Sequence, residues 1–399
     1  MADLKGVLAP KGFRAGAAAC GLKSTGAPDI GLIVSDTPAA WAGAFTTNRV
    51  QAAPVKLCRK RLARPTLRAV VVNAGNANAC TGLAGRRDAE RMATLAAAVV
   101  GARANEVAVA STGVIGRKLD MEKVRSGVEA AGRNLGRSAR HARDIQRAIL
   151  TTDLAAKEAH ASFRSHGKAV TVGGICKGSG MIAPRMATML GFVATDAGIS
   201  SKALRAMLPG VVEETFNAVT VDGDTSTNDS VFVLANGASG TKLASAKEIA
   251  KFRGALTEVC GSLAKQIAAD GEGATKLVTI TVLGARNVSE ARCVARTIAE
   301  SPLVKTALHG ADPNWGRIVC AAGYSGVAVR PERMTLDVQG IRLFERGEPA
   351  RFDAARASRL MRAKEVELRL ELGMGRASAV MWTCDLSKEY ITINADYHT

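Results

Sequence analysis

Residues 177–192 read Lys177-Gly-Ser-Gly-Met-Ile-Ala-Pro-Arg-Met-Ala187-Thr188-Met-Leu-Gly-Phe192, near the middle of a chain of 399 residues. A glycine-rich turn leads here into a small alanine, then a threonine, then an apolar run. This order suggests a chain that cuts itself, with the Thr188 hydroxyl attacking the Ala187 carbonyl; taken alone, a Thr in such an apolar run is more often an ordinary strand or helix residue. After an N-to-O acyl shift and hydrolysis, Thr188 would carry both a nucleophile and its own amine as general base. An unperturbed α-amine has a pKa near about 8, which suits that role.

The composition is that of an ordinary globular protein with an unusually basic balance. Apolar residues make up 47% of the chain and aromatic residues only 4%, so we expect an aliphatic core. Lys and Arg number 54 against 36 Asp and Glu, a net charge of +18. The densest basic stretch, residues 117–147, lacks aromatic side chains for base stacking and any nucleic-acid-binding spacing. We therefore expect anionic metabolites and no nucleic acid as partners, and keep nucleic-acid binding as the alternative from a different class.

The cysteines and the apolar segments indicate the compartment. Eight cysteines are scattered without a C-x-x-C pair, and the N-terminal residues contain no apolar signal region. No window reaches about 18 uninterrupted apolar residues, so we predict no membrane-spanning helix. The five histidines include no pair at ligand spacing. We therefore predict a cytoplasmic protein with free thiols, no membrane partner, no metal and no cofactor.

Short β-rich runs alternate with helical patterns in an irregular order, which predicts a layered α/β (α+β) fold with helices packed on sheets. The clearest helix starts with a capping box at Ser245 and Glu248, and its apolar stripe continues to Ile267. Other helices are expected over residues 289–298 and from Pro302 onward. The predicted strands are residues 68–73, 106–111, 169–172, 230–234, 276–282 and 317–320.

The length of the chain is natural for two domains. No linker longer than a turn is evident, and the least disruptive boundary follows residue 283. We therefore predict a catalytic α/β domain over residues 1–283, which contains the cleavage site, and a smaller C-terminal α/β domain over residues 284–399.

Two further stretches match a known ligand-binding motif only in part, one for dinucleotides and one for calcium. Residues 178–183 fit the dinucleotide fingerprint G-x-G-x-x-G/A, but that motif must open a helix, and Pro184 would then stand inside it. Residues 221–229, Val-Asp-Gly-Asp-Thr-Ser-Thr-Asn-Asp, resemble a calcium loop. However, Thr227 and Val233 stand where an EF-hand requires Gly and Glu. We interpret this stretch as a turn rich in hydrogen bonds from side chains to backbone.

Residues 110–116, Ala-Ser-Thr112-Gly113-Val-Ile-Gly, supply what acyl transfer requires besides a nucleophile. They predict a strand that ends in a hydroxyl and a glycine whose backbone amide is sterically open. Such donors can stabilise an oxyanion. Taken alone, the pattern fits a strand-to-helix connection capped by Thr better. Beside Thr188, the oxyanion interpretation is preferred.

Together these motifs resemble those of the ornithine acetyltransferases, also called glutamate N-acetyltransferases. The match includes residues 177–190, 195–197 and 110–116 and extends from Phe45 to Thr399, almost the whole chain. The resemblance implies cleavage between Ala187 and Thr188, with Thr188 as the catalytic nucleophile. It also places the oxyanion hole on Thr112 and Gly113, and it implies the architecture that this family shares with self-cleaving aminopeptidases.

The substrate-binding residues come from the same resemblance. Lys177 fits a cation that holds a substrate α-carboxylate, and Glu272 fits an acidic contact for an ammonium group. One of Thr151 and Thr152 should contact substrate; the sequence does not decide between them, and residues 154–157 depart from the family pattern. The remaining implied substrate contacts are Asn394, Thr399 and Thr188 itself.

The resemblance implies a self-cleaving N-acetyltransferase of arginine biosynthesis. It would move acetyl from N2-acetylornithine to glutamate through an acetyl-Thr188 intermediate, in a ping-pong reaction. The fragments 1–187 and 188–399 would form an α2β2 heterotetramer, and acetyl-CoA stays open as a second acetyl donor. The alternatives are an acyltransferase for another acylated amine and a self-cleaving amidase or aminopeptidase. Thr188 argues against the last, because those relatives use Ser.

Overall fold

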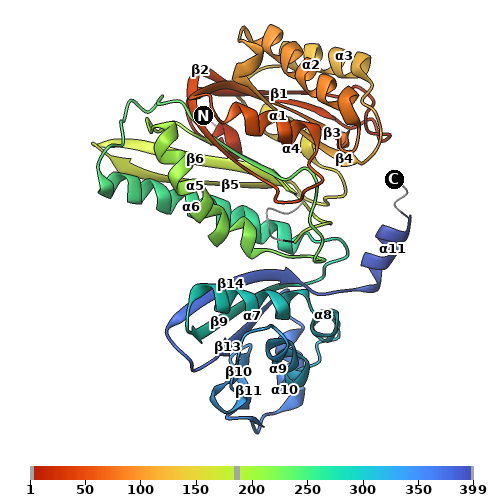
Figure 1. Cartoon of the computed structure of the whole chain (residues 1–399), viewed down its shortest axis with the longest axis vertical. Coiled ribbons are helices and arrows are strands. Elements are labelled where there is room, and N and C mark those ends of the chain that lie inside the picture. The colour runs from red at the N-terminus through yellow and green to blue at the C-terminus, as the bar shows by residue number, and fades with distance from the viewer. Residues whose placement is uncertain (1–3, 184–188, 397–399) are drawn as a thin grey trace.

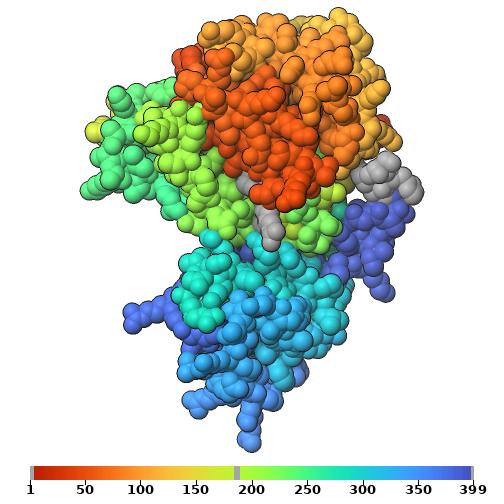
Figure 2. All heavy atoms as spheres, viewed as in Figure 1, coloured from red at the N-terminus to blue at the C-terminus, as the bar shows by residue number. Residues whose placement is uncertain are grey.

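The computed structural model describes residues 4–183 and 189–396, and it contains two β-sheets with helices on their faces (Figure 1). The predicted layered α/β fold is confirmed. Within the described residues, no helix combines the length and the apolar character needed to cross a membrane. In the space-filling view the molecule narrows where the parts built on the two sheets meet (Figure 2).

The first sheet has the strand order β4-β3-β2-β8-β7-β6-β5, with β1 paired to β2. Neighbours are antiparallel except for the parallel pairs β3/β4 and β7/β8. Every residue of β7 and β8 is buried, as expected of central strands covered on both faces. The strands are β1 (Phe13–Ala18), β2 (Ile30–Phe45), β3 (Thr66–Asn76), β4 (Val107–Val114), β5 (Lys157–Ser165), β6 (Lys168–Lys177), β7 (Leu190–Thr195) and β8 (Ser230–Ala235).

Six helices pack on this sheet. Helices α1 (Ala53–Arg61) and α2 (Gly82–Val100) contact β4, whereas α3 (Met121–Arg133) and α4 (Ala139–Ile149) contact β1 and β2. Helix α5 (Ser201–Glu214) contacts β2, and α6 (Ala246–Ala269) contacts β5 and β6. The predicted capping box starts α6: the Ser245 hydroxyl accepts from the Glu248 N–H, and the Glu248 carboxylate accepts from the Ser245 N–H.

The second sheet has the order β12-β11-β10-β13-β9-β14. Its strands are β9 (Leu277–Ala285), β10 (Thr335–Val338), β11 (Ile341–Glu345), β12 (Glu348–Pro349), β13 (Glu365–Glu371) and β14 (Ala377–Cys384). The accompanying helices are α7 (Val288–Glu300), α8 (Pro302–His309), α9 (Trp315–Gly323) and α10 (Ala354–Met361). After β14 the chain forms α11 (Lys388–Asp396), which lies beside the first part of the molecule (Figure 1).

Two predictions from the sequence are corrected here. The boundary after residue 283 falls inside β9, which pairs along its length with β13 and β14; the second sheet therefore begins at Leu277. Residues 317–320 are not a strand but the middle of α9. The Asn314 side chain accepts a hydrogen bond from the Arg317 N–H and caps this helix, which outweighs the β-propensity of Ile318 and Val319.

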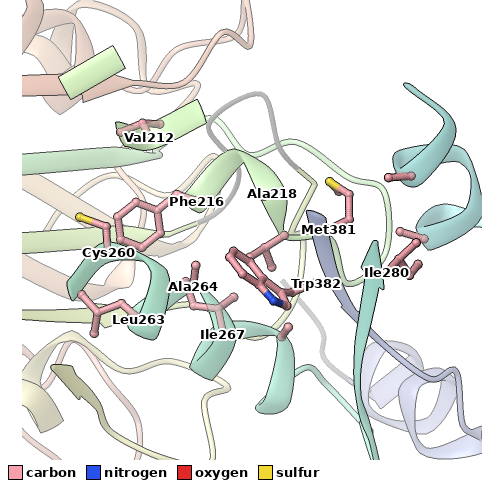
Figure 3. Close-up of a cluster of buried hydrophobic side chains, with 14 of the residues drawn as sticks. Val212, Phe216, Ala218, Cys260, Leu263, Ala264, Ile267, Ile280, Met381 and Trp382 are labelled. Carbon is pink, nitrogen blue, oxygen red and sulfur yellow. The ribbon is translucent and has the colours of Figure 1, made fainter. Parts of the chain in front are cut away.

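A single apolar cluster joins the two sheets. Figure 3 shows Trp382 of β14 beside Ala264 and Ile267 of α6, with Met381 and Ile280 on the side of the second sheet. The Thr220 N–H donates to the Trp382 carbonyl at 3.0 Å, so the backbone is also paired across the junction. The core of one part therefore continues into the core of the other.

Trp382 is the largest side chain at this junction and is only 9% exposed. We expect Trp382→Ala to lower the free energy of unfolding by about 3–5 kcal/mol, because a cavity replaces a buried indole. Urea denaturation followed by circular dichroism at one fixed protein concentration measures this. Val380→Ala on the same strand is the control, because Val380 is exposed and should change stability by less than about 0.5 kcal/mol. Equal effects of the two substitutions would contradict the continuous core.

Candidate active site

A cavity of about 420 Å³ lies where β4 and β6 end, beside the connection from α6 to β9 and the C-terminal helix α11. It gathers seven of the site residues predicted from the sequence: Thr112, Gly113, Thr151, Thr152, Lys177, Glu272 and Asn394. The rest of its lining is Ala77, Ile115, Gly180, Met181, Ser226, Thr227 and Asn228. The predicted cleavage residues Ala187 and Thr188 and the predicted contact Thr399 lie outside the described residues.

The predicted oxyanion residues form the end of β4, beside the parallel strand β3. The backbone of Gly113 has φ +127°, and a Cβ there would lie 2.4 Å from the carbonyl carbon of Gly75. Only glycine fits both this conformation and this close approach. The neighbouring loop is held by Asn228, whose amide donates to the carbonyls of Ala77 at 2.6 Å and Ser111 at 2.8 Å. Thr112 and Gly113 are therefore fixed by backbone packing at the cavity wall.

Lys177 ends β6 and is buried. Its ammonium donates to the Thr151 hydroxyl at 2.7 Å and lies 3.7 Å from the Asp153 carboxylate. Asp153 also accepts from the Gly178 N–H at 2.6 Å and the Thr151 N–H at 3.1 Å. One carboxylate thus fixes both the strand end that carries Lys177 and the loop that carries the threonines.

The cluster continues behind the cavity. Lys157, fully buried, pairs with Asp153 at 2.8 Å and with Asp270 at the end of α6. Burial by itself would raise the pKa of the Asp153 carboxyl, but the ammonium groups of Lys177 and Lys157 outweigh it and hold that pKa well below its ordinary value. Burial would likewise lower the pKa of Lys157, yet Asp153 beside it leaves that pKa raised. Asp153 is therefore ionised wherever the protein is folded near neutral pH.

A second charged residue, Glu272, also lines the cavity. The Glu272 N–H donates to the Ser179 carbonyl, and the Glu272 carboxylate accepts from the Asn394 amide at 2.9 Å. A Cβ at Gly180 would lie 2.2 Å from this carboxylate, so the glycine lets Glu272 pack directly against the turn after β6. The Thr152 hydroxyl shares a hydrogen bond of 2.8 Å with Ser179. The cavity is thus lined by both a cation, Lys177, and an anion, Glu272.

Residues 221–229 contribute more than their sequence suggested. Ser226, Thr227 and Asn228 line the cavity, and carboxylates at both ends of the loop hold the chain that follows β6. Asp222 accepts from the N–H groups of Met181 (2.6 Å) and Ile182 (2.8 Å), and Asp229 accepts from the Met189 N–H at 3.0 Å. Burial raises the pKa of both carboxyls.

The hydrogen bonds of Asp222 and Asp229 support the interpretation of residues 221–229 as a turn rich in hydrogen bonds from side chains to backbone. In the part of the chain that the structure describes, no three His, Cys, Asp or Glu residues are placed to hold a metal ion. One signal in the sequence could have revealed that residues 221–229 lie at the site. This stretch is dense in polar residues and directly precedes β8, a fully buried strand.

Comparisons with known proteins show the family to which the chain belongs. The model of the ArgJ family matches residues 14–399. The chain is 48% identical to the arginine biosynthesis bifunctional protein ArgJ of Symbiobacterium thermophilum, over 99% of this chain and 98% of that one. It is 49% identical to the protein of the same name from Deinococcus radiodurans, over 99% of both chains. The chain belongs to the ArgJ family.

A solved structure extends the comparison. The crystal structure of arginine biosynthesis bifunctional protein argJ from Bacillus halodurans is 46% identical, with a TM-score of 0.52, and the match covers 53% of this chain and 100% of that chain. The resemblance inferred from the sequence is thereby confirmed: the chain is an acyltransferase of arginine biosynthesis, which acts on small molecules.

The Asp153 cluster yields a prediction for stability. Asp153→Asn leaves Lys157 and Lys177 without their shared carboxylate, and we expect a loss of about 3–5 kcal/mol in the free energy of unfolding at pH 7. Because the folded pKa of Asp153 is lowered, its contribution is complete above the unfolded pKa of about 3.9 and is lost as the pH falls through the folded pKa. The gap between wild type and variant should therefore shrink as the pH falls below about 4.

Urea denaturation at a series of pH values measures this gap. Asp36→Asn is the matched control, since Asp36 pairs with Arg14 on the surface, where such pairs contribute little. A gap for Asp153→Asn that stays below about 1 kcal/mol at pH 7, or that grows with acidification, would contradict the account of the cluster.

Proposed function

We propose that this chain cuts itself between Ala187 and Thr188 and then transfers acetyl from N2-acetylornithine to glutamate through an acetyl ester on Thr188. The observation that carries the proposal is the cavity itself. It combines a glycine-enforced strand end at Gly113, a buried ammonium at Lys177 and a carboxylate at Glu272. Thr188 is bonded to Met189, whose N–H donates to Asp229, and Leu190 pairs with Lys177. That Thr188 directly precedes Met189 and Leu190 in the chain supports its assignment as the nucleophile.

The proposed cleavage is an N-to-O acyl shift. The Thr188 Oγ attacks the carbonyl carbon of Ala187, the C–N bond breaks, and the Thr188 amine takes the hydroxyl proton. Water then hydrolyses the ester, which leaves a carboxylate on Ala187 and frees Thr188. The relative from Bacillus halodurans supports a divided chain, because its solved chain is matched in full by 53% of this one. Residues 188–399 make up that same share of the sequence.

Acetyl transfer follows with the groups that cleavage releases. The free amine of Thr188 takes the proton from its own hydroxyl, and Oγ attacks the acetyl carbonyl of N2-acetylornithine. The oxyanion that forms accepts hydrogen bonds from the Gly113 backbone amide and the Thr112 hydroxyl. The C–N bond breaks, the proton passes to the leaving amine, and ornithine departs. Glutamate's amine then attacks the acetyl ester and regenerates the Thr188 hydroxyl.

The charges of the cavity fit both substrates. Each carries an α-carboxylate, for which the Lys177 ammonium and the Thr151 hydroxyl form a ready donor pair. Glu272, fixed by Asn394, suits the side-chain ammonium of the ornithine substrate. Thr152 and the predicted contact Thr399 complete the set that we assign to substrate binding.

The proposal also includes the assembly of the two fragments and a second acetyl donor. We propose that the fragments 1–187 and 188–399 stay together and pair as α2β2 in the cytoplasm, and that the reaction needs no metal or cofactor. Acetyl-CoA as a second donor is compatible with the word bifunctional in the relatives' names. Transfer to another acylated amine is the alternative that substrate profiling distinguishes.

Thr188→Ala tests cleavage and transfer together. We expect wild type to give two masses under denaturing conditions, and the variant one uncut mass without acetyl transfer, because alanine supplies no hydroxyl for either step. Thr188→Ser keeps a hydroxyl and should still be cut. An uncut wild type with full transferase activity would refute the mechanism.

Glu272→Gln tests the assignment of the ammonium contact. The amide oxygen of Gln can still accept from Asn394, so only the charge is lost. We expect the KM for N2-acetylornithine to rise about tenfold or more, since a charge-assisted hydrogen bond is replaced by a neutral one. Cleavage should be unchanged.

Steady-state kinetics with denaturing mass spectrometry measure both effects. Glu389→Gln is the matched control, because Glu389 is an exposed carboxylate on α11, the same helix that carries Asn394. If Glu272→Gln leaves the KM unchanged, Glu272 does not hold the ammonium group.

A further inference from the structure

A second hollow, of about 280 Å³, lies between α1 and α2. It shares no lining residue with the cavity of about 420 Å³ at the candidate active site, called the acyl cavity from here on. Its charged lining consists of four cations and one carboxylate: Lys56, Arg59, Lys60, Arg86 and Glu90. A smaller hollow of about 100 Å³ adjoins it, shares Lys56 and Arg86, and reaches residues 80–82. The surface over α1 and α2 faces the viewer in Figure 2, in red-orange to orange. The proposed acetyl transfer uses none of these charges.

These charges are not neutralised by one another. Within residues 4–183 and 189–396, no ion pair within 4.0 Å involves Lys56, Lys60 or Arg86. Lys56 and Lys60 are four residues apart on α1, an arrangement in which like charges repel. Arg86 and Glu90 have the same spacing on α2 without forming a pair. A concave surface with excess positive charge concentrates anions.

Arg59 supplies a cation of fixed position. Its guanidinium donates to the carbonyl of Thr46 at 2.9 Å and to that of Phe45 at 3.3 Å, and it lies 5.7 Å from the centre of the Phe45 ring. Two of its donors are thus used and the group is held in place. A cation held in this way loses little freedom when an anion binds. The lysines beside it are exposed and can adjust to the ligand.

We propose that this basic hollow, formed by Lys56, Arg59, Lys60 and Arg86, binds the phosphate groups of an anionic ligand. Clustered Arg and Lys side chains are the usual protein partners of phosphate oxygens, and the first turn of α2 contains no acidic residue that would repel them. A diphosphate matches a lining of four cations and one carboxylate better than a single carboxylate ligand does.

The smaller hollow and the acyl cavity are lined by residues that lie close together in the sequence. Ala77 lines the acyl cavity and Cys80 lines the smaller hollow that adjoins the basic one, so the covalent chain keeps the Cα atoms of these two residues within about 11 Å of each other. Two sources of phosphate are consistent with a basic hollow in this place. One is a coenzyme A thioester, whose diphosphate would rest in the hollow while its acyl end reaches Thr112 and Gly113. The other is a free phosphate anion.

Isothermal titration calorimetry with coenzyme A and with inorganic pyrophosphate tests the site. We expect the wild-type chain to bind a phosphate probe, and Lys56→Gln/Lys60→Gln to bind it at least tenfold more weakly. Binding to wild type should weaken as salt is raised. Lys247→Gln/Lys251→Gln is the matched control, because these exposed lysines have the same spacing on α6 and lie outside the hollow. Circular dichroism checks that both double variants are folded.

Kinetics on the same variants distinguish the two sources of phosphate, a coenzyme A thioester and a free phosphate anion. A rise in the KM for acetyl-CoA in Lys56→Gln/Lys60→Gln, with transfer from N2-acetylornithine unchanged, identifies the ligand as coenzyme A. Loss of pyrophosphate binding without that rise identifies a free phosphate anion. The proposal is overturned if neither probe binds wild type at millimolar concentration, or if the double variant binds as tightly as wild type. Neither result bears on acetyl transfer from N2-acetylornithine, which the acyl cavity alone explains.

Discussion

The buried carboxylate of Asp153 is the constraint on which the geometry of the acyl site depends. It joins the loop before β5, the end of β6 and, through Lys157 and Asp270, the end of α6. Two cations and two carboxylates whose side chains are at most 10% exposed balance one another, so removing any one of them leaves a buried charge without its partner. Lys177 is consequently presented to the cavity in one position. The chain leaves β6 at this point, and the first residue of β7, Leu190, pairs with Lys177.

Both sheets contribute to the structure of the site. The first sheet supplies Gly113, Lys177 and the loop that ends at Asp229. The second sheet contributes indirectly: β14 leads into α11, and α11 carries Asn394 back to Glu272. The apolar cluster around Trp382 spans both sheets and packs β14, the strand before α11, against α6 of the first part. The C-terminal part therefore contributes to the cavity lining through Asn394 of α11.

The sequence predicted those features whose cause is local. The helix after Ser245 was legible from its capping box and apolar stripe, and the central strands from their apolar runs. The helix at Ile318 was misread, because the three apolar residues 318–320 outweighed the cap at Asn314. The place of β9 in the second sheet could not be read either, since only its pairing with β13 and β14 decides it. Of the site, Gly113 and Lys177 were found through motifs, whereas Asp153 and Asn228 act by contacts with residues distant in sequence.

The central claim is that Thr188 carries the acetyl group between the two substrates. The most direct measurement is the intact mass of the separated fragments after incubation with N2-acetylornithine in the absence of glutamate. The account predicts that the fragment beginning at Thr188 becomes heavier by one acetyl group, that the added group lies on the Thr188 hydroxyl, and that glutamate removes it. A fragment that stays unmodified while the enzyme exchanges acetyl at its normal rate would contradict the account.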